Sequence, residues 1–211
     1  MQDIFNRAAR GCTLSCTAVV RPHEPIDARS VTPATRMSEF SESYHLRSER
    51  AEDAIELLRR VKRRGYVYQP ANGWVSFVAE DGDFEPDERI VAAASRPLLH
   101  FVSAEDHGWS FTLFERGKEV SSYGCEWEND VTADDSEYSR EALQRLVPSA
   151  DPELLDELER RFHPKEIDEL LELNLPRLFA QALGLEHYEW LSYDYIASDS
   201  PDDHPDVTEV V

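Results

Sequence analysis

GWVSFVAEDG, residues 73–82, recurs 35 positions further along the chain as GWSFTLFERG, residues 108–117. The two copies share a glycine, a tryptophan, a glutamate and a second glycine at the same places. Carried upstream at the same offset, Val67 aligns with Val102, so a helix-strand-turn-strand unit occurs twice. This repeat predicts where the sheet of the protein lies.

Helical and strand patterns extend the unit on both sides. Apolar residues follow helical spacing from Ala51 to Val61, with acids before them and bases after them, and Gly65 is expected to end this helix. A second, shorter helix is expected after Pro86. Alternation and turn residues predict strands over residues 43–47, 66–68, 74–79, 98–103, 109–114 and 119–127.

The predicted order of elements indicates the class of fold. Strand-helix-strand-strand-helix-strand is the split βαβ order of a ferredoxin-like layer, here followed by a further hairpin. From residue 138 the apolar spacing becomes helical, with Ser139 and Asp151 as helix N-caps. We therefore expect an α+β fold in which an antiparallel sheet, built on the duplicated helix-strand-strand unit, is followed by a C-terminal helical section.

Composition predicts the limits of this domain. Residues 1–40 are expected to be a disordered leader or a non-native extension upstream of Met37, because they lack apolar periodicity. Residues 41–196 are expected to form one α+β domain, with a sheet part at 41–128 and a helical part at 138–196. Residues 197–211 are predicted to be an acidic, disordered tail.

The net charge favours some partners over others. The chain holds 43 acidic and 22 basic residues, a net charge of −21. Residues 1–36 contain five arginines against three acids, so all of the acidic excess lies in the rest of the chain. Such a surface repels phosphate backbones, which disfavours direct nucleic-acid binding, and it suits a basic protein partner. High-salt adaptation, GC-rich coding and mimicry of nucleic acid are three explanations that the sequence leaves open.

The number of cysteines, the length of the apolar runs and the spacing of possible ligands bear on localisation and metal binding. Three cysteines and the absence of a membrane-spanning apolar run indicate a cytoplasmic protein that does not enter a membrane. Cys12, Cys16 and His23 do not complete a zinc signature, and Glu159 with His163 lacks a third ligand. No phosphate loop or nucleophile elbow is present in the sequence. We therefore expect no catalytic constellation, metal or cofactor.

Large aromatic residues beside acids are the candidate binding residues. Trp74 and Trp109 begin equivalent strands and are expected to pack in the core or to line a cleft. Acids adjoin aromatic residues in two further stretches, where aromatics would supply affinity and carboxylates would steer a basic target. The candidate residues in these stretches are Glu126, Trp127, Tyr188, Glu189, Trp190 and Tyr193.

Two functions from different classes are consistent with these patterns. We predict a non-catalytic interaction protein that binds through this acidic-aromatic surface. The alternative is a small-molecule-binding protein or an enzyme, with a cleft between the sheet and the C-terminal helices and with His100, His107, Cys125 and Glu126 near strand ends. Residues 188–195 could also clamp the helices onto the sheet, in which case Trp190 would be buried.

Overall fold

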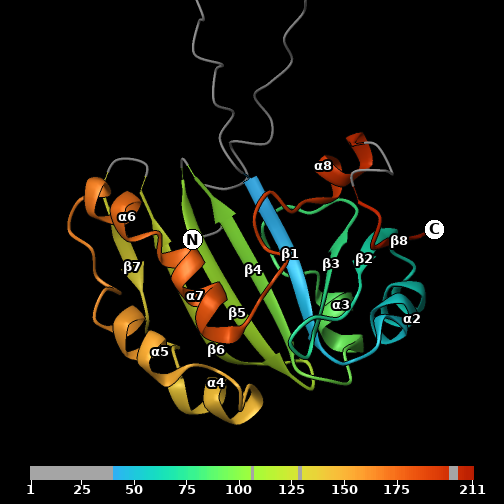
Figure 1. The fold of residues 1–211 in the computed structure, drawn as a ribbon, viewed down its shortest axis with the longest axis horizontal. Coiled ribbons are helices and arrows are strands. Elements are labelled where there is room, and N and C mark those ends of the chain that lie inside the picture. The colour runs from blue at the N-terminus through green and yellow to red at the C-terminus, as the bar shows by residue number, and fades with distance from the viewer. Residues whose placement is uncertain (1–39, 106, 128–129, 200–203) are drawn as a thin grey trace, which may run out of the picture.

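The computed structural model describes residues 40–105, 107–127, 130–199 and 204–211 (Figure 1). In these ranges one antiparallel sheet of eight strands has the order β7-β6-β5-β4-β1-β3-β2-β8. Helices cover both of its faces, so the fold is mixed α and β around an antiparallel sheet, as predicted. The strands are β1 (Phe40–Arg47), β2 (Gly65–Tyr68), β3 (Trp74–Ala79), β4 (Leu98–Ala104), β5 (Gly108–Glu115), β6 (Lys118–Glu126), β7 (Thr132–Asp134) and β8 (Val207–Val210).

The repeated stretches form the strands that the sequence predicts. Residues 74–79 are β3, paired antiparallel with β2, and residues 109–114 lie within β5, paired antiparallel with β4. In both copies the glycine before the tryptophan has positive φ, 80° at Gly73 and 158° at Gly108. A side chain on Gly108 would place its Cβ 2.4 Å from the carbonyl oxygen of Cys125, so the close approach of β6 requires glycine there.

One face of the sheet is covered by α2 (Ala51–Val61) and α3 (Glu88–Ala93). The buried residues of α2 lie on one side of the helix, and the acidic and basic residues at its two ends match the helix dipole. Leu58 and Ile90 are fully buried against Tyr44 and Phe77 of the central strands. The two helices therefore enclose one of the apolar cores of the protein.

The opposite face is covered by α4 (Arg140–Leu146), α5 (Pro152–Glu159), α6 (Ile167–Leu173) and α7 (Leu175–Leu183), as Figure 1 shows. The predicted caps are present, since Ser139 Oγ accepts from Ala142 N–H and Asp151 accepts from two amides of α5. Phe179 of α7 stacks on Phe111 of β5, with ring centroids 4.1 Å apart. The second and larger apolar core lies here.

The chain after α7 returns across the sheet and ends beside it. Residues 193–198 form α8 (Tyr193–Ser198), and Leu191 joins β1 by two hydrogen bonds. The predicted disordered tail differs from the structure at Val207–Val210, which pair with β2 as strand β8. Val210 is buried because it packs into the same apolar core as Leu58 and Val67, and β8 covers the edge that β2 would otherwise expose. The predicted leader lies outside the described residues except for Phe40, which begins β1.

Candidate functional site

A cleft of about 420 Å³ opens between the start of β1, the loop that follows β3 and the start of α8. We call it the acidic cleft, because seven carboxylate residues and one arginine line it together with five aromatic residues. The carboxylate residues are Glu42, Glu80, Asp81, Asp83, Glu85, Asp87 and Asp194, and the arginine is Arg63. The aromatic residues are Phe40, Tyr44, Phe84, Tyr193 and Tyr195.

The loop at residues 80–87 forms one wall of the acidic cleft in a strained conformation. Asp81 and Phe84 have positive φ, 61° and 65°; aspartate adopts this conformation more readily than most residues, but it is uncommon for a bulky residue such as Phe84. Glu42 of β1 holds the loop in place, since its Oε2 accepts from the Phe84 N–H at 2.9 Å. A Cβ on Gly82 would lie 2.5 Å from the same oxygen, so a larger residue at position 82 would displace the Glu42 carboxylate.

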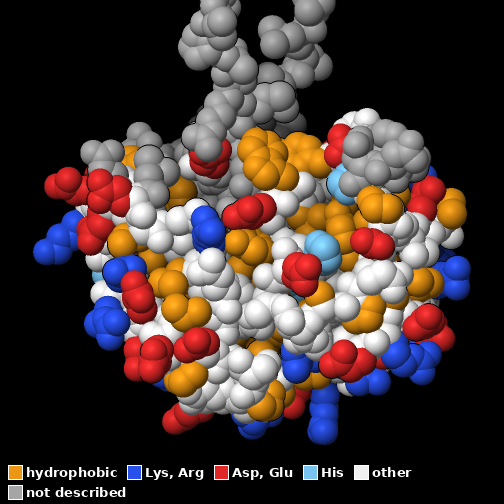
Figure 2. Space-filling model, in the orientation of Figure 1, with side chains coloured by type: hydrophobic (Ala, Val, Ile, Leu, Met, Phe, Trp, Pro, Cys, Tyr) orange, Lys and Arg blue, Asp and Glu red, His pale blue; other side chains and the backbone are white. Residues whose placement is uncertain are grey.

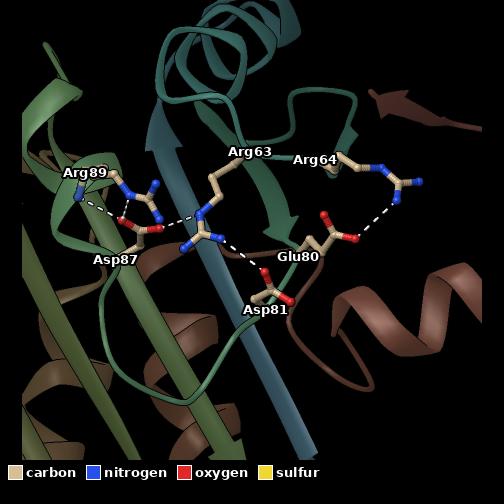
Figure 3. A network of polar contacts seen from close by, with 6 residues as sticks. All are labelled: Arg63, Arg64, Glu80, Asp81, Asp87 and Arg89. Atoms are coloured by element: carbon tan, nitrogen blue, oxygen red, sulfur yellow. Dashed lines mark hydrogen bonds and ion pairs between the residues drawn. The ribbon is translucent and has the colours of Figure 1, made fainter.

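Arg63 lines the cleft and lies between Asp87 and Asp81, with which it pairs (Figure 3). Its Nε lies 2.7 Å from Asp87 and its Nη1 lies 3.3 Å from Asp81. Burial favours the neutral form of Asp87, but hydrogen bonds from the Arg89 N–H and from Arg63 keep its pKa below the usual value. The Asp87 N–H donates to the hydroxyl of Tyr44, whose pKa is raised by burial. The site therefore holds Asp87 ionised.

Glu42, which lines the acidic cleft, pairs with the buried side chain of His100. His100 Nε2 lies 3.1 Å from Glu42 Oε1, and the two side chains are 3% and 10% exposed. His100 also lines a second hollow of about 360 Å³, on the face of β5 and β6 opposite to α4–α7. Phe84 and Glu85 line both hollows and so form the wall between them.

The structure places three of the predicted tryptophans in the core. Trp74 and Trp109 are 1% exposed and Trp127 is 8% exposed. Trp74 Nε1 donates to the Leu183 carbonyl at 2.9 Å, and Trp127 Nε1 donates to the Glu105 carbonyl at 3.3 Å. The two indole hydrogen bonds link β3 to the end of α7 and Trp127 to the residue after β4. All three side chains present little surface to a partner. For Trp74 and Trp109, the position after a turn glycine indicated either core packing or a cleft lining, and both side chains are packed in the core.

The other predicted binding residues lie in three different places. Tyr193 lines the acidic cleft, and Trp190, which is 47% exposed, contacts Tyr195 of the cleft through its ring. Tyr188 is half-buried against the larger core, and its hydroxyl donates to Glu189. Glu126 lies apart from them, in the second hollow. The structure therefore brings Tyr193 and Trp190 together with acids that the sequence analysis did not select.

The predicted catalytic candidates do not form a nucleophile-base arrangement. Cys125 is fully buried, and burial raises the pKa of its thiol. The ring of His107 lies 5.7 Å from that of Phe40, near the start of β1. The apolar core fills the space between the sheet and α4–α7, so the cleft that we describe lies beside α8 instead.

Metal binding and membrane insertion find no support in the described residues. Glu159 accepts hydrogen bonds from Tyr138 and Arg140, whereas His163 pairs with Asp135, so Glu159 and His163 do not share a site. Across residues 40–105, 107–127, 130–199 and 204–211, no three histidine, cysteine or acidic residues are grouped to hold a metal ion. No helix in the same ranges has the length and apolar character to cross a bilayer. Cys12, Cys16 and His23 lie outside the described residues.

Comparison of the chain with protein-family models, with curated proteins and with solved structures finds no match. Sequence reasoning missed the loop acids, although the density of acids around Gly82 was a visible signal. The loop acids come close to residues 192–195 because both segments lie beside β1 in the sheet, and no pattern in the sequence indicates this proximity.

Proposed function

We propose that this chain is a non-catalytic interaction protein whose acidic cleft binds a cationic side chain of a basic protein partner. The observation that supports the proposal most is the lining of the cleft, where carboxylates and aromatic rings surround one space. A cation in such a site is attracted by the carboxylates and by the faces of the rings. The net charge of −21 favours association with a basic protein and opposes direct binding of nucleic acid.

Part of the negative charge is available to such a partner. Asp81 and Asp87 pair with Arg63, and Glu80 pairs with Arg64. Within the described part of the chain, no ion pair involves Asp83, Glu85 or Asp194. These three carboxylates stand on both walls of the cleft, on the strained loop and on α8. A cationic group between them would complete the pairing of charges there.

Binding of a labelled arginine-rich peptide, followed by fluorescence anisotropy at several salt concentrations, tests this proposal. We expect the double variant Asp83→Asn/Asp194→Asn to bind about tenfold more weakly and with less salt dependence, because two attractive charges are removed. A control with the same charge change is Glu56→Gln/Glu172→Gln, since both of these side chains are exposed and lie outside the cleft. Equal weakening in both double variants would mean that net charge alone acts, and would refute the proposed site.

A second candidate function is a small-molecule-binding protein or an enzyme that acts on a small cationic molecule in the same cleft. The contact of Glu42, which lines the cleft, with the buried His100 favours it, because a carboxylate hydrogen-bonded to an imidazole can exchange a proton with a bound molecule. Mass spectrometry of small molecules released from the purified protein separates the two functions. A bound metabolite in stoichiometric amount supports this candidate over a protein partner.

We also propose that β1–β4 with α2 and α3 form a split βαβ layer of the ferredoxin-like type. The neighbouring strands β4-β1-β3-β2 support this, as does the position of a helix between β1 and β2 and between β3 and β4. A duplicated unit is supported by the two successive helix-hairpin segments, α2-β2-β3 and α3-β4-β5. In this arrangement the acidic cleft lies beside the start of the first strand of the layer.

A further inference from the structure

Trp190 combines an exposed ring with an unfavourable backbone conformation. The residue is 47% exposed. Among the exposed large hydrophobic residues of the described ranges, Trp190 has the largest side chain. Its φ of 51° lies in the left-handed region, which a bulky residue rarely adopts. Such conformations persist where the surrounding structure imposes them and are concentrated at functional sites.

The segment that carries Trp190 is anchored on both sides. The Leu191 N–H donates to Ser41 Oγ and the Leu191 carbonyl accepts from the Glu42 N–H, both at 2.9 Å. On the preceding side, the ring of Tyr188 meets Phe101 edge to face at 6.2 Å. The exposure of Trp190 is therefore a feature of an ordered segment, and the ring is held in a defined position.

Trp190 lies next to the acidic cleft. Its ring centroid is 5.9 Å from that of Tyr195, which lines the cleft and accepts a hydrogen bond from the Phe40 N–H at 3.0 Å. Figure 2 shows hydrophobic side chains gathered at the upper end of β1, beside α8, with acidic side chains around them. An apolar contact surface thus borders a site that attracts cations.

We infer that Trp190 anchors an apolar side chain that a basic partner presents next to its cationic side chain. The inference rests on the proposed function and deepens it, because it names the partner as a segment in which basic and apolar residues adjoin. Tryptophan supplies a large contact area at a low cost in conformational entropy, and the carboxylates orient the neighbouring cation. Charge complementarity brings the segment to the cleft, and Trp190 selects among segments of equal charge.

Two synthetic peptides of equal length and charge test the inference, one of alternating arginine and leucine and one of alternating arginine and serine. We expect the arginine-leucine peptide to bind at least ~10-fold more tightly, as tryptophan contacts at interface centres do. Trp190→Ala should abolish this preference, whereas Trp190→Phe should retain most of it. The control is Ile167→Ala, which truncates another exposed hydrophobic residue, 37% exposed, that does not line the cleft; this variant should keep the preference unchanged.

The outcomes separate this inference from the proposed function. Equal affinity for the two peptides, or a preference that persists in Trp190→Ala, would overturn the role of Trp190. If the peptides nevertheless bind more weakly to Asp83→Asn/Asp194→Asn, the cleft proposal stands alone. Urea unfolding of Trp190→Ala is measured alongside, and a largely unfolded variant would show that the ring is a structural clamp, which also overturns the inference.

Discussion

His45 on the central strand β1 should make the protein sensitive to acid. Its side chain is fully buried, with Nε2 3.0 Å from Ser43 Oγ and Nδ1 2.9 Å from Ser76 Oγ. The rings of Trp74 and Phe101 approach it edge to face. No carboxylate is among these neighbours, so a proton on His45 would place an uncompensated charge in the core.

Burial lowers the pKa of His45 from 6.5 to about 3, with smaller effects from His187 and His100 in the same direction. The unfolded chain therefore binds a proton at this residue more readily than the folded chain does. The stabilisation is complete above about pH 6.5 and is lost as the pH falls towards 3. Between pH 7 and pH 4 the free energy of unfolding should fall by about 3 kcal/mol from His45 alone, at 1.36 kcal/mol for each pKa unit.

Urea unfolding followed by tryptophan fluorescence at pH 7 and pH 4 measures this loss in the natural chain and in His45→Gln. The variant retains a hydrogen-bonding side chain but cannot be protonated in this range, so it should be less stable at pH 7 and lose about 3 kcal/mol less on acidification. Comparing the two proteins removes the contribution of the carboxylates, which is common to both. An equal loss of stability in both proteins would refute the assignment of acid sensitivity to His45.

Two substitutions test the packing of the sheet. Gly65→Ala should destabilise the protein by about 2–4 kcal/mol in urea unfolding, because the new Cβ would lie 2.3 Å from the Val78 carbonyl oxygen, and a change below about 0.5 kcal/mol would contradict this close approach. Val210→Asp should cost about 2–3 kcal/mol, because it places a carboxylate at a buried position of β8, whereas Val211→Asp, at an exposed neighbour, should have little effect. Equal stability of the two valine variants would mean that β8 does not pack on β2 in solution.

Local patterns were sufficient for most of the secondary structure. The strands that follow Gly73 and Gly108 were predicted because alternation and turn glycines act over a few residues. The helix α2 was predicted from its apolar spacing and charged ends, and the N-caps Ser139 and Asp151 were predicted from residue type. These features depend on interactions between near neighbours in the chain, and such interactions can be read without knowing the fold.

The role of individual aromatic residues could not be predicted in the same way. Trp74 and Trp190 were both candidate binding residues from the sequence, yet one is 1% exposed and the other 47% exposed. Trp74 is buried because α7 ends above β3, where the Leu183 carbonyl accepts its indole N–H. Exposure depends on which segment packs above a residue, and that segment lies more than a hundred positions away in the chain.

The sequence by itself determined the class of fold, the acidic surface and the strands of the repeat, because composition and short-range periodicity carry that information. Only the tertiary structure decided that β1 lies between β3 and β4, that Val207–Val210 complete the sheet, and that Glu42 and Asp83 face Tyr193 and Asp194 across one cleft. Strand order and the return of the chain after α7 bring these groups together. Their meeting depends on pairings between distant segments, which are set by how the whole core packs and leave no local pattern in the sequence.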